Sequence, residues 1–348
     1  MKHMKKIIFF LVVMGFVSCN NQDKMFDDFE TQSLYFPFQY PVRTLSLGND
    51  RLDNSLDKQH KFNIGISIGG LYMQNTKNWT ANFEVDNSLV FQYLVNAKGD
   101  TLRVLPAAYY TLSPASTVTI PKGSFAGLIE VQLTDAFFAD SLSIKGNYVI
   151  PVKIISSPDD VEILRGVATE GILTPNIHVT TDWSVLPRDY TLFGIKYVNP
   201  YHGTWLRRGK MVVKSSVGDV LSTVVYRTRS VEFDIPTTLT TTKLNEVNGT
   251  MNVETESWKV NLSVDNDKNI LVKTATGSAI TVNGTGKYVE NGDTWGGTPE
   301  NPTPRDVLHV NYTYTRTNGN ICEVSDTLVF RDRGIKIEEA RPTVKLPL

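Results

Sequence analysis

Apolar and polar side chains alternate along most of this chain with a period of two residues. This period places successive side chains on opposite faces of an extended strand, so each run predicts a strand with one buried face. Turn sequences rich in Asn, Asp, Gly and Pro separate the runs, and only 133–142 suits a helical turn. The pattern therefore predicts an all-β protein made of antiparallel sandwiches or barrels. The alternating runs lie at 62–68, 129–133, 148–154, 231–235, 258–264 and 310–314.

A long interruption of this alternation predicts a domain boundary. Turn residues and two prolines, Pro175 and Pro187, occupy the interval between two sets of alternating runs. A chain of 348 residues also usually forms more than one hydrophobic core. We therefore expect a first β-domain at 31–157, a connector at 158–190 and a second β-domain at 191–348.

The first 18 residues have the pattern of a signal peptide. Three lysines precede an apolar run at 7–17, which at about 11 residues is too short to span a bilayer. The run ends in Phe-Val-Ser before Cys19, which resembles the lipobox of exported lipoproteins. We predict that 1–18 is removed and that Cys19 carries the lipid. An ordinary signal peptide with an incidental cysteine is the alternative.

Residues 19–30 form a short polar tether with Asp23, Asp27, Asp28 and Glu30. An acidic stretch directly after the lipidated cysteine resembles the signal that sends Bacteroidetes lipoproteins to the outer face of the cell. We therefore predict a lipid-anchored protein of the outer membrane that faces the cell exterior. Attachment on the periplasmic face is the alternative.

Charge and cysteine content exclude several partners and stabilising devices. The formal net charge is −1, and loss of the leader with its three lysines lowers it to −4. This mild acidity argues against nucleic acid or anionic lipid as a partner. Cys322 is left without a partner once Cys19 carries lipid, so each domain depends on its own core. No later apolar run approaches the length of about 18 residues that predicts a membrane-spanning helix.

The spacings of known catalytic and metal-binding motifs are missing. No zinc-protease motif, nucleophile elbow or phosphate-binding loop occurs. The segment 265–269 spaces its oxygen ligands as a calcium loop does, but Ile270 and Thr276 stand where Gly and Glu are needed, so a hairpin turn is favoured. We expect no catalytic residue, no metal site and no cofactor. None of the four histidines outside the leader is paired at metal-ligand spacing: His60, His178, His202 and His309.

Trp295 is the main candidate for ligand binding. It lies in the irregular stretch 290–306 beside Asn291 and Asp293, without apolar neighbours in the sequence. An exposed indole stacks well on a sugar ring, and nearby Asn and Asp side chains bond hydroxyl groups. The alternative is a loop that folds back so that the indole covers the end of the second domain.

A weaker pair of binding candidates lies in the first domain. Trp79 and Tyr72 stand at the two ends of a stretch that resembles a hairpin loop. Both offer an aromatic face for a sugar ring.

A three-residue pattern at the start of the second domain predicts a barrel. Gly203 and Trp205 frame a Gly-x-Trp sequence that resembles the signature of lipocalin-type barrels. In that signature the Trp closes the barrel floor beneath an Arg from the last strand, a position open here to Arg331 or Arg333. A second sandwich is the alternative.

Several stretches in order resemble known families. The first domain resembles DUF1735, which is found at the N-terminus of Bacteroidetes surface lipoproteins, and the second resembles DUF5627. This resemblance implies an Ig-like sandwich followed by a lipocalin-like antiparallel β-barrel. It also implies an association with outer-membrane glycan-uptake systems, but it supplies no catalytic residue. The DUF1735-like stretches are 35–41, 68–72, 105–112, 120–124 and 133–138, and the DUF5627-like stretches are 190–197 and 201–205.

Three functions remain open from the sequence. The first is a non-catalytic surface lipoprotein that binds a polysaccharide or acts as an adhesin. The second is a structural or assembly partner of outer-membrane transporter proteins, which uses exposed strand edges and binds no sugar. The third is an enzyme acting on glycans whose site the sequence does not reveal.

Overall fold

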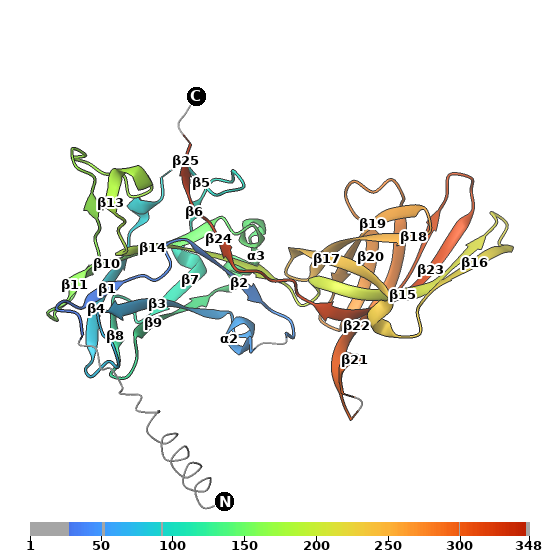
Figure 1. Cartoon of the computed structure of the whole chain (residues 1–348). Coiled ribbons are helices and arrows are strands. Elements are labelled where there is room, and N and C mark those ends of the chain that lie inside the picture. The colour runs from blue at the N-terminus through green and yellow to red at the C-terminus, as the bar shows by residue number, and fades with distance from the viewer. Residues whose placement is uncertain (1–27, 51–52, 92, 299, 346–348) are drawn as a thin grey trace, which may run out of the picture.

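The computed structural model describes residues 28–50, 53–91, 93–298 and 300–345. These residues form two β-domains joined end to end, a sandwich followed by a barrel (Figure 1). The all-β prediction is therefore confirmed. The predicted signal peptide, Cys19 and most of the tether lie outside the described residues. No helix in the described part of the chain is long and apolar enough to cross a bilayer.

Two facing sheets make up the sandwich, as predicted for the first domain. Both sheets are mainly antiparallel, and β14 runs parallel to β2. The first sheet has the order β11 (Glu162–Ile163), β1 (Ser33–Tyr35), β3 (Lys61–Gly69), β9 (Ala126–Leu133) and β7 (Tyr110–Ser113). The second has the order β24 (Glu338–Glu339), β2 (Pro41–Ser46), β14 (Tyr190–Val198), β10 (Tyr148–Ser156), β4 (Trp79–Val85) and β8 (Thr117–Ile120), with β6 (Arg103–Val104) beside β10.

Short elements surround the sandwich. The helical turn expected within 133–142 is present as α3. Two small strand pairs are β12 (Val167–Ala168) with β13 (Trp183–Val185), and β5 (Leu94–Val95) with β25 (Thr343–Val344). The short helices are α2 (Ser55–Lys58), α3 (Asp135–Ala139), η1 (Asn87–Leu89), η2 (Ala107–Tyr109), η3 (Ser141–Ile144), η4 (Thr180–Asp182) and η5 (Val231–Phe233).

The sandwich core follows directly from the period-two pattern. Along β3 the inward side chains from Phe62 to Ile68 are no more than 2% exposed, whereas the side chains between them are half-buried. Ile129 and Val131 of β9 are fully buried in the same core. Each such side chain contributes roughly 1.5–3 kcal/mol when it leaves water, so the alternation accounts for the pairing of these strands.

The second domain begins later than predicted. The boundary at residue 191 is wrong, because β14 is a central strand of the sandwich, between β10 and β2. Ile195 and Tyr197 point into the sandwich core, while Tyr190 and Leu192 pack on the opposite face of the same sheet. Much of the predicted connector also belongs to the sandwich, since β11 pairs with β1. The chain leaves the sandwich only at 199–202.

Eight antiparallel strands close into the predicted barrel, which excludes a second sandwich. Closure comes from the long pairing of β15 with β23. One further strand, β16, pairs only with the outer half of β15 and extends away from the barrel (Figure 1). The barrel strands are β15 (Gly203–Lys214), β17 (Ile235–Lys243), β18 (Glu246–Val253), β19 (Glu256–Val264), β20 (Asn269–Thr274), β21 (Val282–Thr298), β22 (Asn301–Thr315) and β23 (Ile321–Asp332), with β16 (Val220–Tyr226) outside the ring.

Large side chains fill the barrel. Trp205 and Trp258 are among the largest fully buried side chains, and Met251, Tyr312 and Leu328 belong to the same cluster. The interior of the barrel is therefore a hydrophobic core, and the outside of the barrel and its junction with the sandwich are the places where a ligand could bind.

Arg333 is the arginine that lies at the barrel floor. The indole of Trp205 donates to the Tyr201 carbonyl oxygen at 3.0 Å and meets the ring of Phe330 edge to face. The Arg333 guanidinium stacks on Phe330, 4.2 Å from the ring centre, so Phe330 stands between the Trp and the Arg. Arg331, the other candidate, is exposed and faces Asp332.

The chain crosses between the domains twice. After the outward crossing at 199–202, residues 334–345 return from the barrel to the sandwich, and we call this returning segment the strap (Figure 1). In the strap, β24 pairs with β2 and β25 pairs with β5. Ala340 of the strap packs in the cluster on the outer face of the second sheet. Two crossings restrain the relative orientation of the domains more than one linker would.

Arg333 forms hydrogen bonds with both domains at the point where the strap begins. Its guanidinium donates to the carbonyl oxygens of Asn49 in the sandwich, of Pro200 in the outward crossing and of His202. The side chain is buried, with a residue exposure of 3%. Hydrogen bonds from a charged donor are each worth about 1.5–3 kcal/mol, so this cluster is the strongest polar contact of the junction.

We predict that Arg333→Met destabilises the protein by about 3 kcal/mol, because three buried carbonyl oxygens lose their donor. Urea denaturation followed by tryptophan fluorescence measures the change. Arg331→Met is the matched control, and its exposed side chain predicts a change within about 0.5 kcal/mol. Equal stability of the two variants would show that the Arg333 contacts contribute nothing.

Candidate functional site

Trp79 is not a binding residue. Its side chain is 3% exposed and lies in the sandwich core, where the indole N–H donates to Asn75 Oδ1 at 2.9 Å. The prediction is wrong because Trp79 starts β4 and is the first inward position of the series that continues with Ala81 and Phe83. That alternation is visible in the sequence and identifies the indole as core.

Tyr72 is exposed but stands apart from the other predicted binding residues. It lies in the loop between β3 and β4 and is 49% exposed, next to Met73 at 62%. Its backbone N–H donates to Asp28 Oδ1 at 2.6 Å, which places it where the described chain begins. Tyr72 belongs to the sandwich and Trp295 to the barrel, so the two do not form one site.

Trp295 packs on the barrel. The irregular loop expected at 290–306 is a hairpin extension of β21 and β22. The indole is half-buried, donates to the Phe330 carbonyl oxygen at 2.9 Å and lies against the Arg305 guanidinium, 4.6 Å from the ring centre. The bare indole required for sugar stacking is therefore absent, and the alternative, a segment folded back onto the barrel, agrees with the structure.

The two neighbours of Trp295 shape the hairpin instead of a binding face. Asn291 has a positive φ of 52°, and its N–H donates to Asp306 Oδ1 at 3.1 Å. Asp293 accepts from the N–H of Thr294 at 2.7 Å. These contacts stabilise the turn through which β21 continues.

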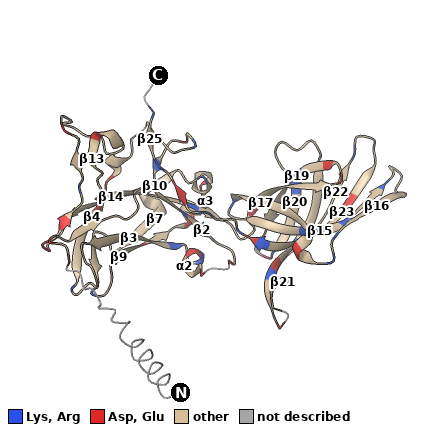
Figure 2. Cartoon of the chain, in the orientation of Figure 1, with Lys and Arg blue, Asp and Glu red and all other residues tan. Residues whose placement is uncertain are grey.

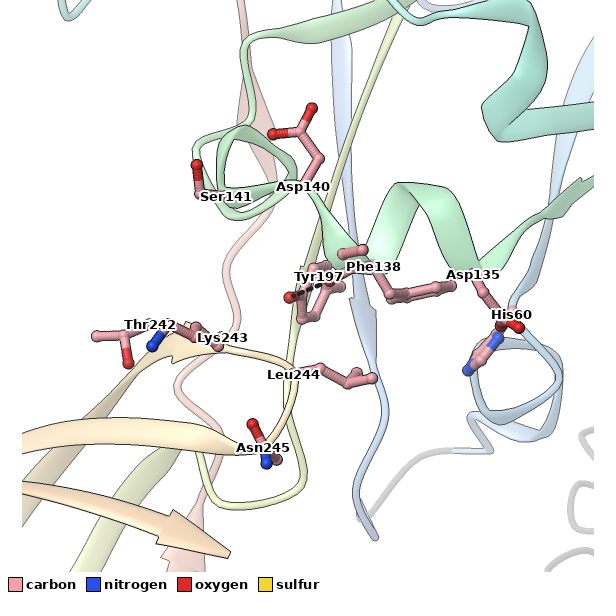
Figure 3. Close-up of a pocket in the computed structure, with 11 residues that line it drawn as sticks. His60, Asp135, Phe138, Asp140, Ser141, Tyr197, Thr242, Lys243, Leu244 and Asn245 are labelled. Atoms are coloured by element: carbon pink, nitrogen blue, oxygen red, sulfur yellow. Dashed lines mark hydrogen bonds between the residues drawn. The ribbon is translucent and has the colours of Figure 1, made fainter. Parts of the chain in front are cut away.

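A pocket of about 330 Å³ lies between the two domains. We call it the interdomain pocket (Figure 3). The sandwich supplies one wall through α3 and the start of η3, and the barrel supplies the other through the end of β17 and its turn. Domain interfaces are a common place for ligand sites. The lining residues are His60, Asp135, Phe138, Ala139, Asp140, Ser141, Tyr197, Thr242, Lys243, Leu244 and Asn245.

Aromatic residues form the floor of the interdomain pocket. The rings of His60 and Phe138 lie 4.1 Å apart, and the Tyr197 hydroxyl donates to the Phe138 carbonyl oxygen at 3.2 Å. His60 has a positive φ of 62°, an uncommon conformation for a residue with a side chain. Burial lowers the pKa of His60, and Asp135 opposes that shift. The floor is therefore apolar with one imidazole edge.

The barrel wall of the pocket is a two-residue turn held by Asn199. The Asn199 amide, in the outward crossing, donates to the carbonyl oxygens of Lys243 and Glu246 at 2.8 Å each. These bonds direct Leu244 and Asn245, at the tip of the turn, toward the sandwich (Figure 3). Leu244 remains 42% exposed, although it is apolar.

The polar groups of the pocket differ in whether they already make hydrogen bonds within the protein. Burial alone would raise the pKa of Asp140, but bonds from Tyr148, the Leu142 N–H and Tyr109 hold it below its ordinary value. Within the described residues, the side chains of Asp135, Ser141 and Asn245 make no hydrogen bond. They are therefore available to a ligand. Lys243 is exposed and pairs with Glu246 at 3.2 Å.

No nucleophile is hydrogen-bonded to a histidine base among the described residues of this pocket. Ser141 and His60 lie at opposite ends of the group drawn in Figure 3. Asp140 is engaged by its own domain, as shown above. A nucleophile within hydrogen-bond reach of a base is the signature of covalent catalysis, and these side chains do not show it.

The segment considered for calcium is an ordinary turn. Asp265 accepts from the backbone N–H of Asn269 at 2.8 Å and from its amide at 3.0 Å. Among the described residues, no group of three His, Cys, Asp or Glu side chains is placed to hold a metal ion. Figure 2 shows basic and acidic residues interspersed along both domains, with no separation by sign.

Comparisons with known proteins cover both domains. The family described as "Domain of unknown function (DUF5627)" matches residues 200–334. A family described as an N-terminal domain, equivalent to DUF1735, matches residues 29–161. A Bacteroides ovatus crystal structure, titled as a structural genomics protein of unknown function, is 34% identical with a TM-score of 0.80. The alignment covers 91% of this chain and 100% of that chain.

The chain belongs to this two-domain family. No curated protein matches it. The DUF5627 match starts at residue 200, which agrees with the structural boundary at 199–202 and not with the predicted one. Neither family description assigns a ligand, so the site has to be argued from its own geometry.

His202 makes the junction beside the pocket sensitive to pH. Its Nδ1 accepts from the Thr241 N–H at 3.1 Å, and its carbonyl oxygen accepts from Arg333. Burial, with Arg333 and Lys196 nearby, lowers its pKa to about 4. The imidazole is therefore neutral in the folded protein over most of the acidic range.

We predict that the protein loses stability between pH 6.5 and pH 4 because of His202. Its unfolded pKa of 6.5 lies above the folded value, so stabilisation is complete above pH 6.5 and falls as the unfolded state takes up the proton. The full loss is on the order of 3 kcal/mol. Thermal denaturation at pH 7 and pH 4.5 is expected to show a smaller difference for His202→Asn than for the native chain. His309→Asn, an exposed change on β22, serves as control. An unchanged difference in His202→Asn contradicts the prediction.

Proposed function

We propose that this chain is a non-catalytic, lipid-anchored surface protein that binds a saccharide in the interdomain pocket. The observation that carries the proposal is the pairing of an apolar floor with uncommitted polar side chains from both domains. Saccharides have an apolar ring face and a rim of hydroxyl groups, so they match such a pocket. The volume of about 330 Å³ suits one or two sugar rings.

Binding in this pocket divides between its floor and its rim. A sugar ring packs its apolar face mainly on Leu244, above the largely buried Phe138 that lines the pocket. Its hydroxyl groups bond Asp135 and Ser141 on the sandwich side and the Asn245 amide on the barrel side. The two crossings and the Arg333 contacts fix the walls before the ligand arrives, which reduces the ordering cost of binding.

The non-catalytic part of the proposal rests on the arrangement of the polar groups. Asp140 is bound to Tyr148 and Tyr109, and Ser141 faces away from His60 (Figure 3). Capture without bond cleavage is the function that such groups support. The enzyme alternative requires release of product from a glycan.

The lipid anchor stays part of the proposal. It rests on the lipobox-like sequence before Cys19 and on the acidic residues that follow. A tether to the outer membrane raises the local concentration of binding sites at the cell surface, so a weak pocket still retains a polymeric ligand. The Bacteroides origin of the related structure supports a surface protein of this bacterial group.

A second candidate function is supported by β16. Among the described strands it pairs with β15 alone, and its Val220, Leu221 and Val225 side chains are exposed by more than half. Exposed apolar edge strands pair readily with a strand of another protein. An assembly partner of an outer-membrane complex would dock here. Leu221→Lys is expected to abolish this docking while saccharide binding is kept, and this result would distinguish the second function from the first.

We predict that Lys243→Ala with Asn245→Ala weakens saccharide binding about tenfold, equivalent to about 1.4 kcal/mol. Both side chains line the barrel wall of the pocket and are exposed, so the fold is expected to persist. Affinity electrophoresis against a panel of neutral and acidic polysaccharides measures the effect. Reducing-end release in the same samples tests the enzyme alternative.

Lys259→Ala is the matched control for that experiment, since Lys259 is an exposed lysine on the outer face of the barrel. Its binding is expected to equal that of the native chain. Binding that is unaffected by the double change, or no binding to any polysaccharide, contradicts the proposed site. Release of reducing ends by the native chain contradicts the non-catalytic proposal.

We predict that Cys19→Ser moves the protein from the detergent phase to the aqueous phase in Triton X-114 partitioning, because the lipid has no attachment point. Globomycin is expected to accumulate the precursor of the native chain. Cys322→Ala is the control and keeps the native partitioning. Proteinase K digestion of intact cells tests outward orientation. Unchanged processing and partitioning of Cys19→Ser would exclude the anchor.

A further inference from the structure

We propose that a second pocket, in the sandwich, binds a sugar that carries a carboxylate, of the uronic acid class. The pocket has a volume of about 400 Å³ and uses none of the residues of the interdomain pocket. It lies under the strap, and we call it the strap pocket. The inference rests on the proposed function only in taking a saccharide as the ligand. Its main lining residues are Phe38, Tyr40, His178, Arg188, Tyr190 and Arg341.

The Tyr40 oxygen at the base of the pocket is left as an acceptor. The Tyr190 hydroxyl donates its only proton to the Ile177 carbonyl oxygen at 3.1 Å. The short hydrogen bond between Tyr40 and Tyr190 must therefore be donated by Tyr40. The Tyr40 oxygen keeps its lone pairs and offers them to a donor on a ligand.

His178, which lines the same pocket, holds a second and buried acceptor. Its Nε2 lies 2.7 Å from the Leu89 carbonyl oxygen, which accepts only, so Nε2 carries the proton. Burial lowers the pKa of His178, which keeps the imidazole neutral. Its Nδ1 is then a lone pair, and it has no partner among the described residues although the residue is only 9% exposed. A buried acceptor without a donor is costly, so a shift of the pocket lining that brings a ligand hydroxyl to this atom would be favourable.

Two arginines stand at the mouth of the pocket. Arg188 uses Nη1 on Gln39 Oε1 at 2.7 Å and on the Pro37 carbonyl oxygen, which leaves its other nitrogens for a ligand. Arg341 uses Nε on Glu339 at 3.0 Å. Glu339 also lines the pocket, so these three groups carry one net positive charge. A guanidinium binds a carboxylate with paired hydrogen bonds, and one carboxylate would neutralise this excess.

Arg188 and Arg341 both act on the tyrosine pair. Burial raises the pKa of Tyr40, and Arg341 opposes that shift. Burial also raises the pKa of Tyr190, and Arg188 opposes it. The two cations therefore lie near the tyrosine pair, and all four residues line the same pocket.

Phe38 supplies the apolar platform. Its side chain is 66% exposed and lies in the loop between β1 and β2, where it lines the pocket. A ligand that meets all of these groups has hydroxyl donors, a carboxylate and one apolar ring face. Neutral sugars leave the net positive charge of Arg188, Arg341 and Glu339 unbalanced, and simple carboxylates lack the hydroxyls, so a uronic acid fits best.

Trigalacturonate and its methyl ester form the matched probe pair, because esterification removes the negative charge and keeps the rings. Isothermal titration is expected to show at least tenfold tighter binding of trigalacturonate than of the ester, and weaker binding in high salt. Arg188→Gln with Arg341→Gln is expected to abolish this preference. Phe38→Ala is expected to weaken both probes, and Tyr40→Phe to weaken trigalacturonate with the salt dependence kept.

Lys243→Ala with Asn245→Ala separates this inference from the proposed function. Unchanged trigalacturonate binding in that variant is expected, since it alters only the interdomain pocket. Equal affinity for acid and ester, or native affinity in the double arginine variant, overturns the strap pocket as a carboxylate site. Trigalacturonate binding lost only in the Lys243 and Asn245 variant also overturns it and places the acid in the interdomain pocket. Neutral saccharide binding without any trigalacturonate binding removes this inference alone.

Discussion

The buried guanidinium of Arg333 is the interaction on which the arrangement of the two domains depends. It joins a sandwich loop, the outward crossing and the barrel floor through the carbonyl oxygens of Asn49, Pro200 and His202. A charged group out of water is tolerated only when its donors are used, and this one has carbonyl partners from both domains. The strap leaves the barrel directly after Arg333, so the same contact sets the start of the segment that covers the strap pocket.

Local pattern predicted five strands, β3, β9, β10, β19 and β22, and the identity of their buried faces. The strand expected at 231–235 was wrong, because Val231–Phe233 form the helical turn η5. Period-two alternation identifies Phe62 to Ile68 as core, and the same rule applied at Trp79 would have placed its indole inside the sandwich. The Trp79 prediction was wrong because it relied on the aromatic residue type and not on the position of Trp79 in the alternation of inward and outward side chains. Around Trp295 the sequence shows no alternation, because Gly and Pro interrupt 290–306. The hairpin there is defined by the pairing of β22 with β21.

Long-range pairing explains what the sequence could not supply. The alternation around residues 190–198 is equally suited to a sandwich or a barrel strand, and only pairing with β10 and β2 decides between them. Both pockets are assembled from segments far apart in the chain: His60, Asp135 and Lys243 in one, Phe38, His178 and Arg341 in the other. No rule of sequence spacing relates such residues, so no sequence motif could identify them.

The filled barrel changes the role that the second domain has in binding. Trp205, Trp258 and their neighbours occupy the space in which a hollow barrel of this type would hold a ligand. Removing them would cost several kcal/mol each, so these side chains contribute to the stability of the barrel. The barrel reaches the interdomain pocket only through the turn at Leu244 and Asn245, which Asn199 fixes against the sandwich. In the proposed function the barrel is therefore a rigid support that presents one short turn, and most of the proposed ligand contacts come from the sandwich and the segments that cover it.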